Sequence, residues 1–401
     1  MNKAKKWLSL LLCVVMLFAV MTGCGDNSAA NDANQDDQEE QLQIGGDIED
    51  TTEMEQTHNY ANAYATFDPE EVVMTANGKD ILWKDFFYFI EYYITYVEMY
   101  TGTVTDWSAE LTEGTTYQDY VVDGAAEWMK YAAAVEANAD TLGAGMTEED
   151  EAEIQAQWDS IVEQYGTKEA FIEQMGQYYC TEELYNHMLK TTLLGDKCLA
   201  ALYGENGSNL TDEQVAEYIA DDGYLRAKHI LISKTYTDDE GNEVEYTEEE
   251  MKDRLALAND ILSQLKAASP EELPDLFDTL MNQYSEDPGG LLMYPDGYLF
   301  VEGDMVTEFY EGTLAIEIGQ ISELVETPYG YHIIYRLPLD FDATPQQYSS
   351  YYVSGSQEYT LRALTAKSMF DSVLAGWTEA VEVTYTDVID KIDLTTMLAF
   401  G

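Results

Sequence analysis

Residues 226–232 read RAKHILI, residues 284–290 read YSEDPGG, and residues 327–334 read TPYGYHII. All three stretches lie within Tyr224–Leu337. The whole chain contains four histidines, and the two in this segment, His229 and His332, sit in the first and last of these stretches. This segment therefore says most about the fold and the chemistry of the chain.

The residues around these stretches indicate alternating strands and helices. Ala227–Lys234 has the composition of a strand, and Val325–Leu337 predicts a second one. Between them, the acidic stretch Thr237–Glu250 leads into a helix that ends near Lys266, and Phe277–Tyr284 predicts further helical turns. This β-α-α-β order predicts a compact α/β domain whose motifs fall on strand ends and loops.

In order and spacing, the three stretches resemble a parvulin-type peptidyl-prolyl cis/trans isomerase domain. The resemblance implies an antiparallel sheet and catalysis of rotation about X-Pro bonds, whose barrier of ~18–20 kcal/mol can limit folding. Such a reaction needs no nucleophile, metal or other cofactor, because an apolar pocket and a twisted geometry weaken the resonance of the amide. A metal site on the two histidines is not expected, since no third ligand lies at a suggestive spacing.

The resemblance assigns four catalytic residues. His229 and His332 match the paired histidines on adjacent central strands, Thr327 matches the hydroxyl residue beside them, and Asp287 matches a Cys-or-Asp position. The implied arrangement is a hydrogen-bonded imidazole pair whose tautomers are fixed by Thr327, with Asp287 near the prolyl amide.

The proline pocket is assigned in the same way. Met305 and Phe309 match pocket positions, and an aromatic ring with a flexible thioether suits a pyrrolidine. The Gly-Gly-Asp-Leu-Gly loop of the family is replaced by Gly289–Phe300. Either Tyr298 or Leu299 is expected to substitute for the pocket leucine of that loop, and both are predicted substrate-binding residues.

Two further departures bear on rate and specificity. Val306 stands where many active members have Gln. The loop after the first histidine carries four acidic residues, Asp238, Asp239, Glu240 and Glu243. A phosphate-specific parvulin needs Arg or Lys there, so recognition of phospho-Ser/Thr-Pro is not expected.

The N-terminus predicts export and lipid anchoring. Three lysines precede the apolar run Trp7–Met21, and Met21-Thr22-Gly23-Cys24 resembles a lipobox, so residues 1–23 are predicted to be a lipoprotein signal peptide. Cys24 is the predicted lipidation site. An uncleaved signal anchor and a secretory peptide cut elsewhere are the alternatives. Residues 24–68 are polar and acidic, which predicts a disordered tether.

The segment 69–222 is predicted to form a helical lobe. A strand–Asn77-Gly78–strand hairpin leads into a helical pattern. The following helices are predicted at Tyr120–Leu142, Glu148–Tyr165, Lys168–Gln177, Glu182–Leu202 and Asp212–Ile219. The opening hairpin and the last helix, which runs into the isomerase segment, resemble the chaperone lobe of PrsA- and SurA-like foldases.

Residues 339–401 are expected to return to that lobe. An apolar helical stripe precedes the alternating stretch Val381-Glu382-Val383-Thr384-Tyr385. The predicted fold class is therefore α+β, with a helical lobe built from N- and C-terminal segments and the parvulin domain (residues 223–338) inserted between them. An independent C-terminal helix on the isomerase is the alternative.

The charge balance restricts the partners. The 77 acidic and 19 basic residues give a net charge of −58, which repels nucleic acid and anionic lipid. The membrane is therefore expected to hold the protein through the lipid alone. The acidity most simply provides solubility outside the cell; attraction of basic clients or Ca²⁺ has no local support.

Together these features predict a membrane-anchored foldase on the outer face of a Gram-positive-type envelope. It is expected to isomerise X-Pro bonds in unfolded or newly secreted proteins. The alternatives are a binding-only holdase with a silent parvulin domain and a solute-binding lipoprotein, which would need two α/β lobes. The sequence does not decide the clients, the rate or whether a homodimer forms.

Overall fold

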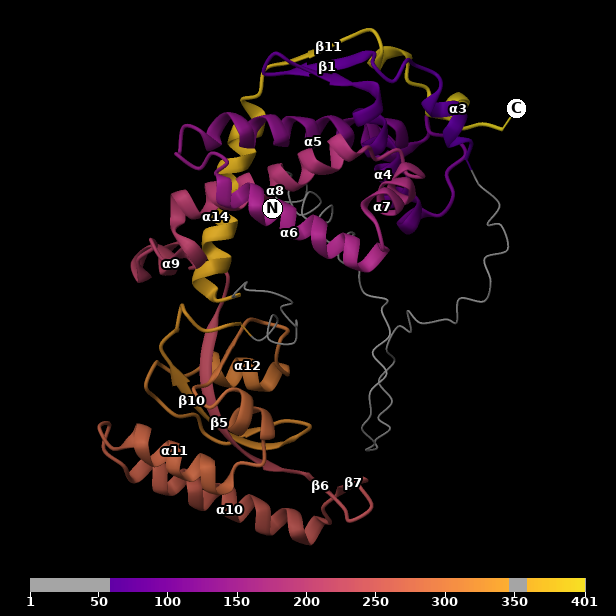
Figure 1. Cartoon of the computed structure of the whole chain (residues 1–401). Helices are drawn as coiled ribbons and strands as arrows, with labels where there is room; N and C mark the ends of the chain where they lie inside the picture. The colour runs from indigo at the N-terminus through magenta and orange to yellow at the C-terminus, as the bar shows by residue number, and fades with distance from the viewer. Residues whose placement is uncertain (1–57, 346–358, 401) are drawn as a thin grey trace. The chain divides into compact units, whose positions relative to one another are not determined.

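The computed structural model describes residues 58–345 and 359–400 (Figure 1). The predicted signal peptide, Cys24 and most of the predicted tether lie outside these residues. The chain divides into two compact units. The first contains the described residues up to Cys198 and those from Asp371 onward, and the second runs from Leu199 to Phe370.

The folded part begins earlier than the predicted end of the tether at residue 68. Helix α3 (Tyr60–Tyr64) is capped by the side chain of Asn59, which accepts from the amide of Asn62. Ala63 of this helix and His58 before it are buried. A five-residue helix is too short to show a periodic pattern, so the sequence did not separate it from the acidic stretch before it.

The first unit opens with the predicted hairpin. Strands β1 (Val72–Ala76) and β2 (Lys79–Leu82) pair antiparallel. Asn77 and Gly78 make the turn with φ values of 50° and 75°, which suit Asn-Gly. Helix α4 (Trp83–Thr101) follows directly and buries an aromatic-rich face.

Capped helices complete this lobe. The small hairpin β3 (Glu110–Thr112) and β4 (Thr115–Thr116) precedes helices α5 (Tyr117–Ala139), α6 (Glu148–Tyr165), α7 (Lys168–Gly176) and α8 (Glu182–Tyr203). Thr116 and Thr147 form capping boxes at the starts of α5 and α6. The start of α5 lies three residues before the predicted one, because this cap begins the helix ahead of its apolar stripe.

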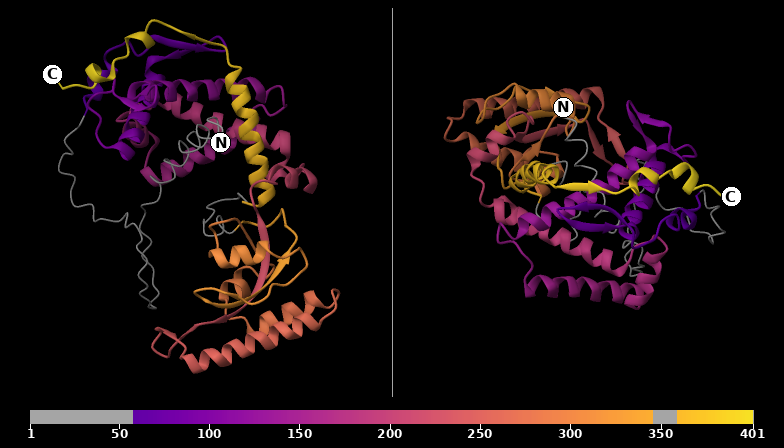
Figure 2. Two further views of the ribbon diagram at one scale, coloured as in Figure 1. Left: turned by 180° about the vertical axis from the view of Figure 1, so that it is seen from behind. Right: turned by 90° about the horizontal axis from the view of Figure 1, so that it is seen from above.

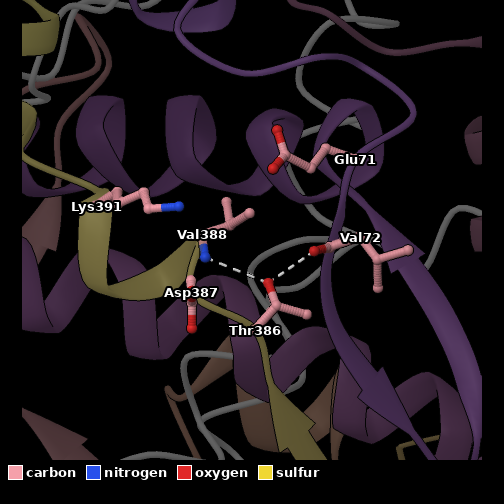
Figure 3. Close-up of a pocket in the computed structure, with 6 residues that line it drawn as sticks. All are labelled: Glu71, Val72, Thr386, Asp387, Val388 and Lys391. Atoms are coloured by element: carbon pink, nitrogen blue, oxygen red, sulfur yellow. Dashed lines mark hydrogen bonds between the residues drawn. The ribbon is translucent and has the colours of Figure 1, made fainter.

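The C-terminal segment joins the same lobe. After helix α14 (Leu361–Glu379), strand β11 (Val383–Tyr385) pairs antiparallel with β1, which gives the sheet order β11-β1-β2 (Figure 1). Thr386 donates to the carbonyl of Val72 at 2.7 Å and accepts from the amide of Val388, beside a shallow pocket of 360 Å³ (Figure 3). A short 3₁₀ turn (Ile389–Lys391) and α15 (Leu394–Met397) follow. The predicted architecture, one lobe from both ends of the chain, is confirmed.

The second unit is built on a four-stranded antiparallel sheet. A 3₁₀ turn (Glu205–Gly207) and α9 (Asp212–Tyr218) come first. The sheet order is β8-β5-β10-β9, with β5 (Leu225–Ser233), β8 (Tyr298–Phe300), β9 (Val325–Glu326) and β10 (Gly330–Leu337). The hairpin β6 (Thr235–Thr237) and β7 (Glu243–Glu245) carries the acidic loop.

The alternation of residues along β5 and β10 gives the sheet two different faces. On one face, Ile230, Ile232, Ile333 and Tyr335 pack against α10 (Glu248–Ala267) and α11 (Leu273–Tyr284), which lie side by side (Figure 2). The other face carries both histidines and is covered by α12 (Thr307–Leu314). One face therefore packs against the two helices, and the other combines the two histidines with a second, smaller apolar cluster.

Two remaining features concern membrane and thiol chemistry. Within residues 58–345 and 359–400, no helix combines the length and apolarity needed to cross a membrane. Cys180 and Cys198 are buried and free.

Candidate active site

The two histidines meet on the face of the sheet that α12 covers. In the antiparallel register of β5 and β10, His229 lies opposite Ile334 and His332 lies opposite Leu231. The histidines are therefore diagonal neighbours, within reach of long side chains. Their rings are stacked with centroids 5.0 Å apart, and Nδ1 of His229 lies 2.9 Å from Nδ1 of His332.

Each outer nitrogen of this pair has a partner of its own. Nε2 of His229 lies 2.7 Å from Oδ2 of Asp287, and Nε2 of His332 lies 2.8 Å from Oγ1 of Thr327. The four residues that the sequence predicted as catalytic thus form one hydrogen-bonded line, Asp287–His229–His332–Thr327. Both histidines and Thr327 are buried, and the carboxylate end is the more exposed one.

Asp287 is held in place by the loop that contains it. Glu286 donates its amide to Leu231 of β5 at 2.9 Å, which fixes this segment alongside the strand. The carboxylate accepts from the amides of Gly289 and Gly290 at 3.1 and 2.9 Å and from the hydroxyl of Tyr298 at 2.8 Å. With His229 these are four donors. Its geometry makes Asp287 an anchor for His229 rather than a free group aimed at an amide.

The direction of the hydrogen bonds follows from the chemistry of the ends. An ionised carboxylate can only accept, so His229 donates from Nε2, and in an uncharged ring its Nδ1 is then left to accept. His332 then donates from Nδ1, and its Nε2 accepts from the hydroxyl of Thr327. The oxygen of that hydroxyl accepts in turn from the amide of Tyr329 at 3.1 Å. In this arrangement of two uncharged rings, every donor points toward Asp287.

The electrostatics favour an uncharged His332 and an ionised Asp287. Burial, together with the neighbouring His229 and Lys234, lowers the pKa of His332 to about 3, against the attraction of Asp287. Burial works to raise the pKa of Asp287, but the hydrogen bond and charge of His229, with Tyr298 and Gly290, outweigh it and bring that pKa to about 2. Burial and the contact with Asp287 raise the pKa of Tyr298, so its hydroxyl stays a donor.

Aromatic and apolar side chains border the imidazoles. The ring of Phe309, on α12, lies edge-on to both histidines at 5.1 and 5.5 Å between centroids. Phe300 lies 5.6 Å from Phe309, and Met305 packs partly buried against the same cluster. Of the two predicted pocket residues, Phe309 therefore contacts both imidazoles, and Met305 packs against the cluster that contains Phe309.

The altered loop supplies Tyr298 and not Leu299. Its first part, Gly289–Met293, is a π-helical turn, and its end forms β8. Because side chains alternate along a strand, Tyr298 faces the site, with its ring 5.8 Å from that of His229. Leu299 points to the opposite side and packs with Leu210, Val215 and Leu361, so its predicted place in the pocket is wrong.

Sequence reasoning missed several parts of this site. Helix α12 and strand β8 were not predicted, and neither were the amide donors of Gly289 and Gly290 or the hydroxyl contact of Tyr298. The glycine pair after Asp287 was the one available signal for a tight backbone approach. Among the described residues, no group of three His, Cys, Asp or Glu side chains is placed to hold a metal ion.

Comparison with known proteins agrees with this geometry. The profile of the PPIC-type PPIase domain matches residues 215–336. A foldase protein PrsA of Geobacillus sp. (strain WCH70) is 31% identical over 184 residues, which cover 45% of this chain and 54% of that protein. A foldase protein PrsA of Halalkalibacterium halodurans is 32% identical over 157 residues, 38% of each chain. The chain spans about half the length, or less, of these curated relatives.

Solved structures of PrsA proteins also match. The peptidylprolyl isomerase PrsA of Bacillus cereus is 20% identical, with 72% of this chain and 97% of that one covered and a TM-score of 0.27. PrsA of Bacillus subtilis is 18% identical, with 69% of this chain and 89% of that one covered and a TM-score of 0.22. Residues 215–336 are thus a parvulin-type domain that matches the PPIC-type PPIase family, and part of the chain is similar in sequence to PrsA foldase proteins.

Proposed function

We propose that this chain is an extracytoplasmic, membrane-anchored foldase that isomerises X-Pro bonds in secreted proteins and assists their folding. The observation that carries the proposal is the line Asp287–His229–His332–Thr327, with Phe309 edge-on to both imidazoles. The match of residues 215–336 to the PPIC-type domain supports it.

The site suits a reaction that makes and breaks no bond. A prolyl ring packs on Phe309 and Met305, and the buried imidazole pair provides a fixed polar wall beside it. Because both rings are hydrogen-bonded at every nitrogen, they hold their geometry. Loss of water and a bound, twisted geometry then weaken the resonance of the prolyl amide, which lowers the barrier to rotation.

The substrate is an unphosphorylated polypeptide. The two cations beside the site, Lys234 and Arg254, are already paired with Glu326 and Glu286. The acidic hairpin β6–β7 adds negative charge after β5. A phosphate group would find paired cations and a repulsive field there. Basic or neutral residues before the proline fit better.

A binding-only holdase is the second candidate, and one observation favours it. The loop Gly289–Phe300 departs from the family pattern, and the hydroxyl of its Tyr298 donates a hydrogen bond to the carboxylate of Asp287. Three of the four donors reach Oδ2, so a substrate contact at that oxygen must displace one of them. In this reading the first unit binds unfolded chains and the parvulin domain is silent.

One pair of measurements separates the two candidates. We expect the chain from residue 25 onward to accelerate cis/trans isomerisation of an Ala-Pro peptide, and to suppress aggregation of an unfolded protein. His332→Gln should abolish most of the acceleration and leave suppression of aggregation unchanged, with melting curves run in parallel. A wild-type rate equal to the uncatalysed one, with aggregation still suppressed, would establish the holdase.

The anchor is proposed on the lipobox at Met21–Cys24 alone. We expect the native protein to partition with membranes, and Cys24→Ala to be released to the medium or left unprocessed. A cleaved Cys24→Ala protein that stays in the membrane fraction would refute lipidation.

A further inference from the structure

Lys234 is the first residue after β5, and its backbone fastens a turn on the neighbouring strand. Its amide donates to the carbonyl of Tyr329 at 2.8 Å. That turn, residues 327–330, is closed by the amide of Thr327, which donates to the carbonyl of Gly330 at 2.9 Å. A Cβ on Gly330 would lie 2.2 Å from the carbonyl oxygen of Ile232, so the turn lies directly against β5.

The side chain of Lys234 returns to the same turn. Its ammonium donates to the carbonyl oxygen of Thr327 at 2.8 Å and pairs with Oε1 of Glu326 at 2.9 Å. It also lies 6.0 Å from the ring centroid of Tyr331. A hydrogen bond from a charged donor is stronger than one between neutral groups. Lys234 therefore binds the turn at two carbonyls, one from its main chain and one from its side chain.

The residue held at the centre of these contacts is Thr327. Its hydroxyl must donate to Nε2 of His332 for the whole line of donors to point toward Asp287, and its oxygen accepts from the amide of Tyr329. A shift of the turn would break the 2.8 Å contact with His332. That imidazole would then be free to adopt the other tautomer, in which its Nδ1 no longer donates to His229.

The charge of Lys234 acts in the same direction. The charged or titratable groups that act on His332 are His229, Asp287 and Lys234, and the ammonium opposes protonation of the ring. A protonated His332 would donate from Nε2 and reverse its bond with Thr327. Contact and charge thus both favour the one neutral arrangement that the line of hydrogen bonds requires.

We propose that Lys234 is a positioning residue of the isomerase site, which clamps the 327–330 turn and so holds the Thr327 hydroxyl against His332. This role rests on the proposed isomerase function. It adds a residue that touches neither imidazole and that the sequence motifs do not include.

The test compares three substitutions in the chain from residue 25 onward. Lys234→Met keeps the aliphatic stem and removes the ammonium, and Lys234→Arg keeps a charged donor. The matched control is Lys228→Met, because Lys228 lies on β5 and its ammonium pairs with Asp278 at 2.8 Å, away from the turn. All three are compared by melting temperature, by the ¹⁵N spectrum of the His332 imidazole and by kcat/KM for a proline peptide.

We expect Lys234→Met to lower kcat/KM by about threefold to tenfold, the effect of one lost hydrogen bond. It should also shift the His332 nitrogens, while Lys234→Arg restores both toward wild type and Lys228→Met changes neither. An unchanged His332 spectrum in Lys234→Met, or the same change in Lys228→Met, would overturn the positioning role. The spectrum is read without substrate, so it decides this point even where the wild type shows no isomerase activity.

Discussion

The Nδ1 atoms of His229 and His332 lie 2.9 Å apart although the register of the sheet does not pair the two residues. The contact is diagonal, so it depends on how the rings are turned and not on the strands alone. Asp287 fixes one ring from outside the pair and Thr327 fixes the other. Asp287 and Thr327 therefore determine how the two imidazole rings are oriented and where their protons lie.

The burial of neutral His332 predicts a loss of stability on acidification. Its pKa falls from 6.5 to about 3 in the folded chain, so below pH 6.5 the unfolded state binds a proton that the folded state does not. The stabilisation is complete above pH 6.5 and is lost as the pH falls toward 3, by ~1.4 kcal/mol per unit. Asp287 adds to the loss only below its ordinary value of 3.8.

This pH effect can be isolated by difference. Amide hydrogen exchange of Ile230 and Ile333, corrected for the intrinsic rate, reports the free energy of opening the sheet. Between pH 7 and pH 4.5 we expect that free energy to fall by about 2–3 kcal/mol more in wild type than in His332→Gln. Equal slopes in the two proteins would show that His332 is not buried in its neutral form.

Tyr298 is expected to hold Asp287 through its hydroxyl. Tyr298→Phe removes one of three donors to Oδ2 and keeps the ring against His229, so we expect a decrease of about threefold to tenfold in kcat/KM. Tyr294→Phe is the control, because the ring of Tyr294 lies tilted against that of Tyr298, with centroids 4.6 Å apart, and no hydrogen bond joins Tyr294 to Asp287 in the described residues. A Tyr298→Phe variant faster than wild type would instead mean that the hydroxyl blocks the carboxylate, as in the holdase candidate.

Much of this fold could be predicted from the sequence, because the helix caps, turn residues and apolar periodicity agree with the tertiary structure. Helix α6 begins and ends at the predicted residues, Glu148 and Tyr165, since a capping box starts it and Gly166 follows it. The alternation along β5 and β10 places both histidines on one face. In these elements the apolar pattern, the caps and the turns all favour the same structure.

The parts that were not predicted depend on contacts between distant residues or on very short elements. Strand β8 has three residues, and nothing in Gly289–Phe300 by itself says that Tyr298 rather than Leu299 faces the histidines. That choice is made by pairing with β5, where Tyr298 lies opposite Ala227. A shift of one residue in this pairing would place Leu299 on the histidine face and Tyr298 on the other. The three residues of the strand are too few for their sequence pattern to determine the register.

Met305 offers a test of substrate binding that spares the fold. It is partly buried at the edge of the cluster around Phe309, so Met305→Ala should cost much less stability than the ~2–5 kcal/mol of a fully buried methionine. We expect a raised KM for proline peptides and a nearly unchanged melting temperature. Met281→Ala is the contrast, because Met281 is buried on the other face of the sheet. A fall in stability without a change in KM for Met305→Ala would assign Met305 to the core.

The last prediction tests whether the C-terminal segment stabilises the lobe that the N-terminal segment begins. Leu394 of α15 is 0% exposed and its amide donates to the Gln118 side chain at 2.8 Å. Leu394→Ala should destabilise the first unit by ~2–5 kcal/mol, whereas Phe400→Ala, at a residue 57% exposed, should have little effect.

Every tryptophan in the described residues lies in the first unit, so tryptophan fluorescence in urea follows that unit alone. Isomerase activity, which reports the second unit, should stay at the wild-type level in Leu394→Ala. Equal urea midpoints for wild type and Leu394→Ala would contradict a structural role of the C-terminal segment in the lobe.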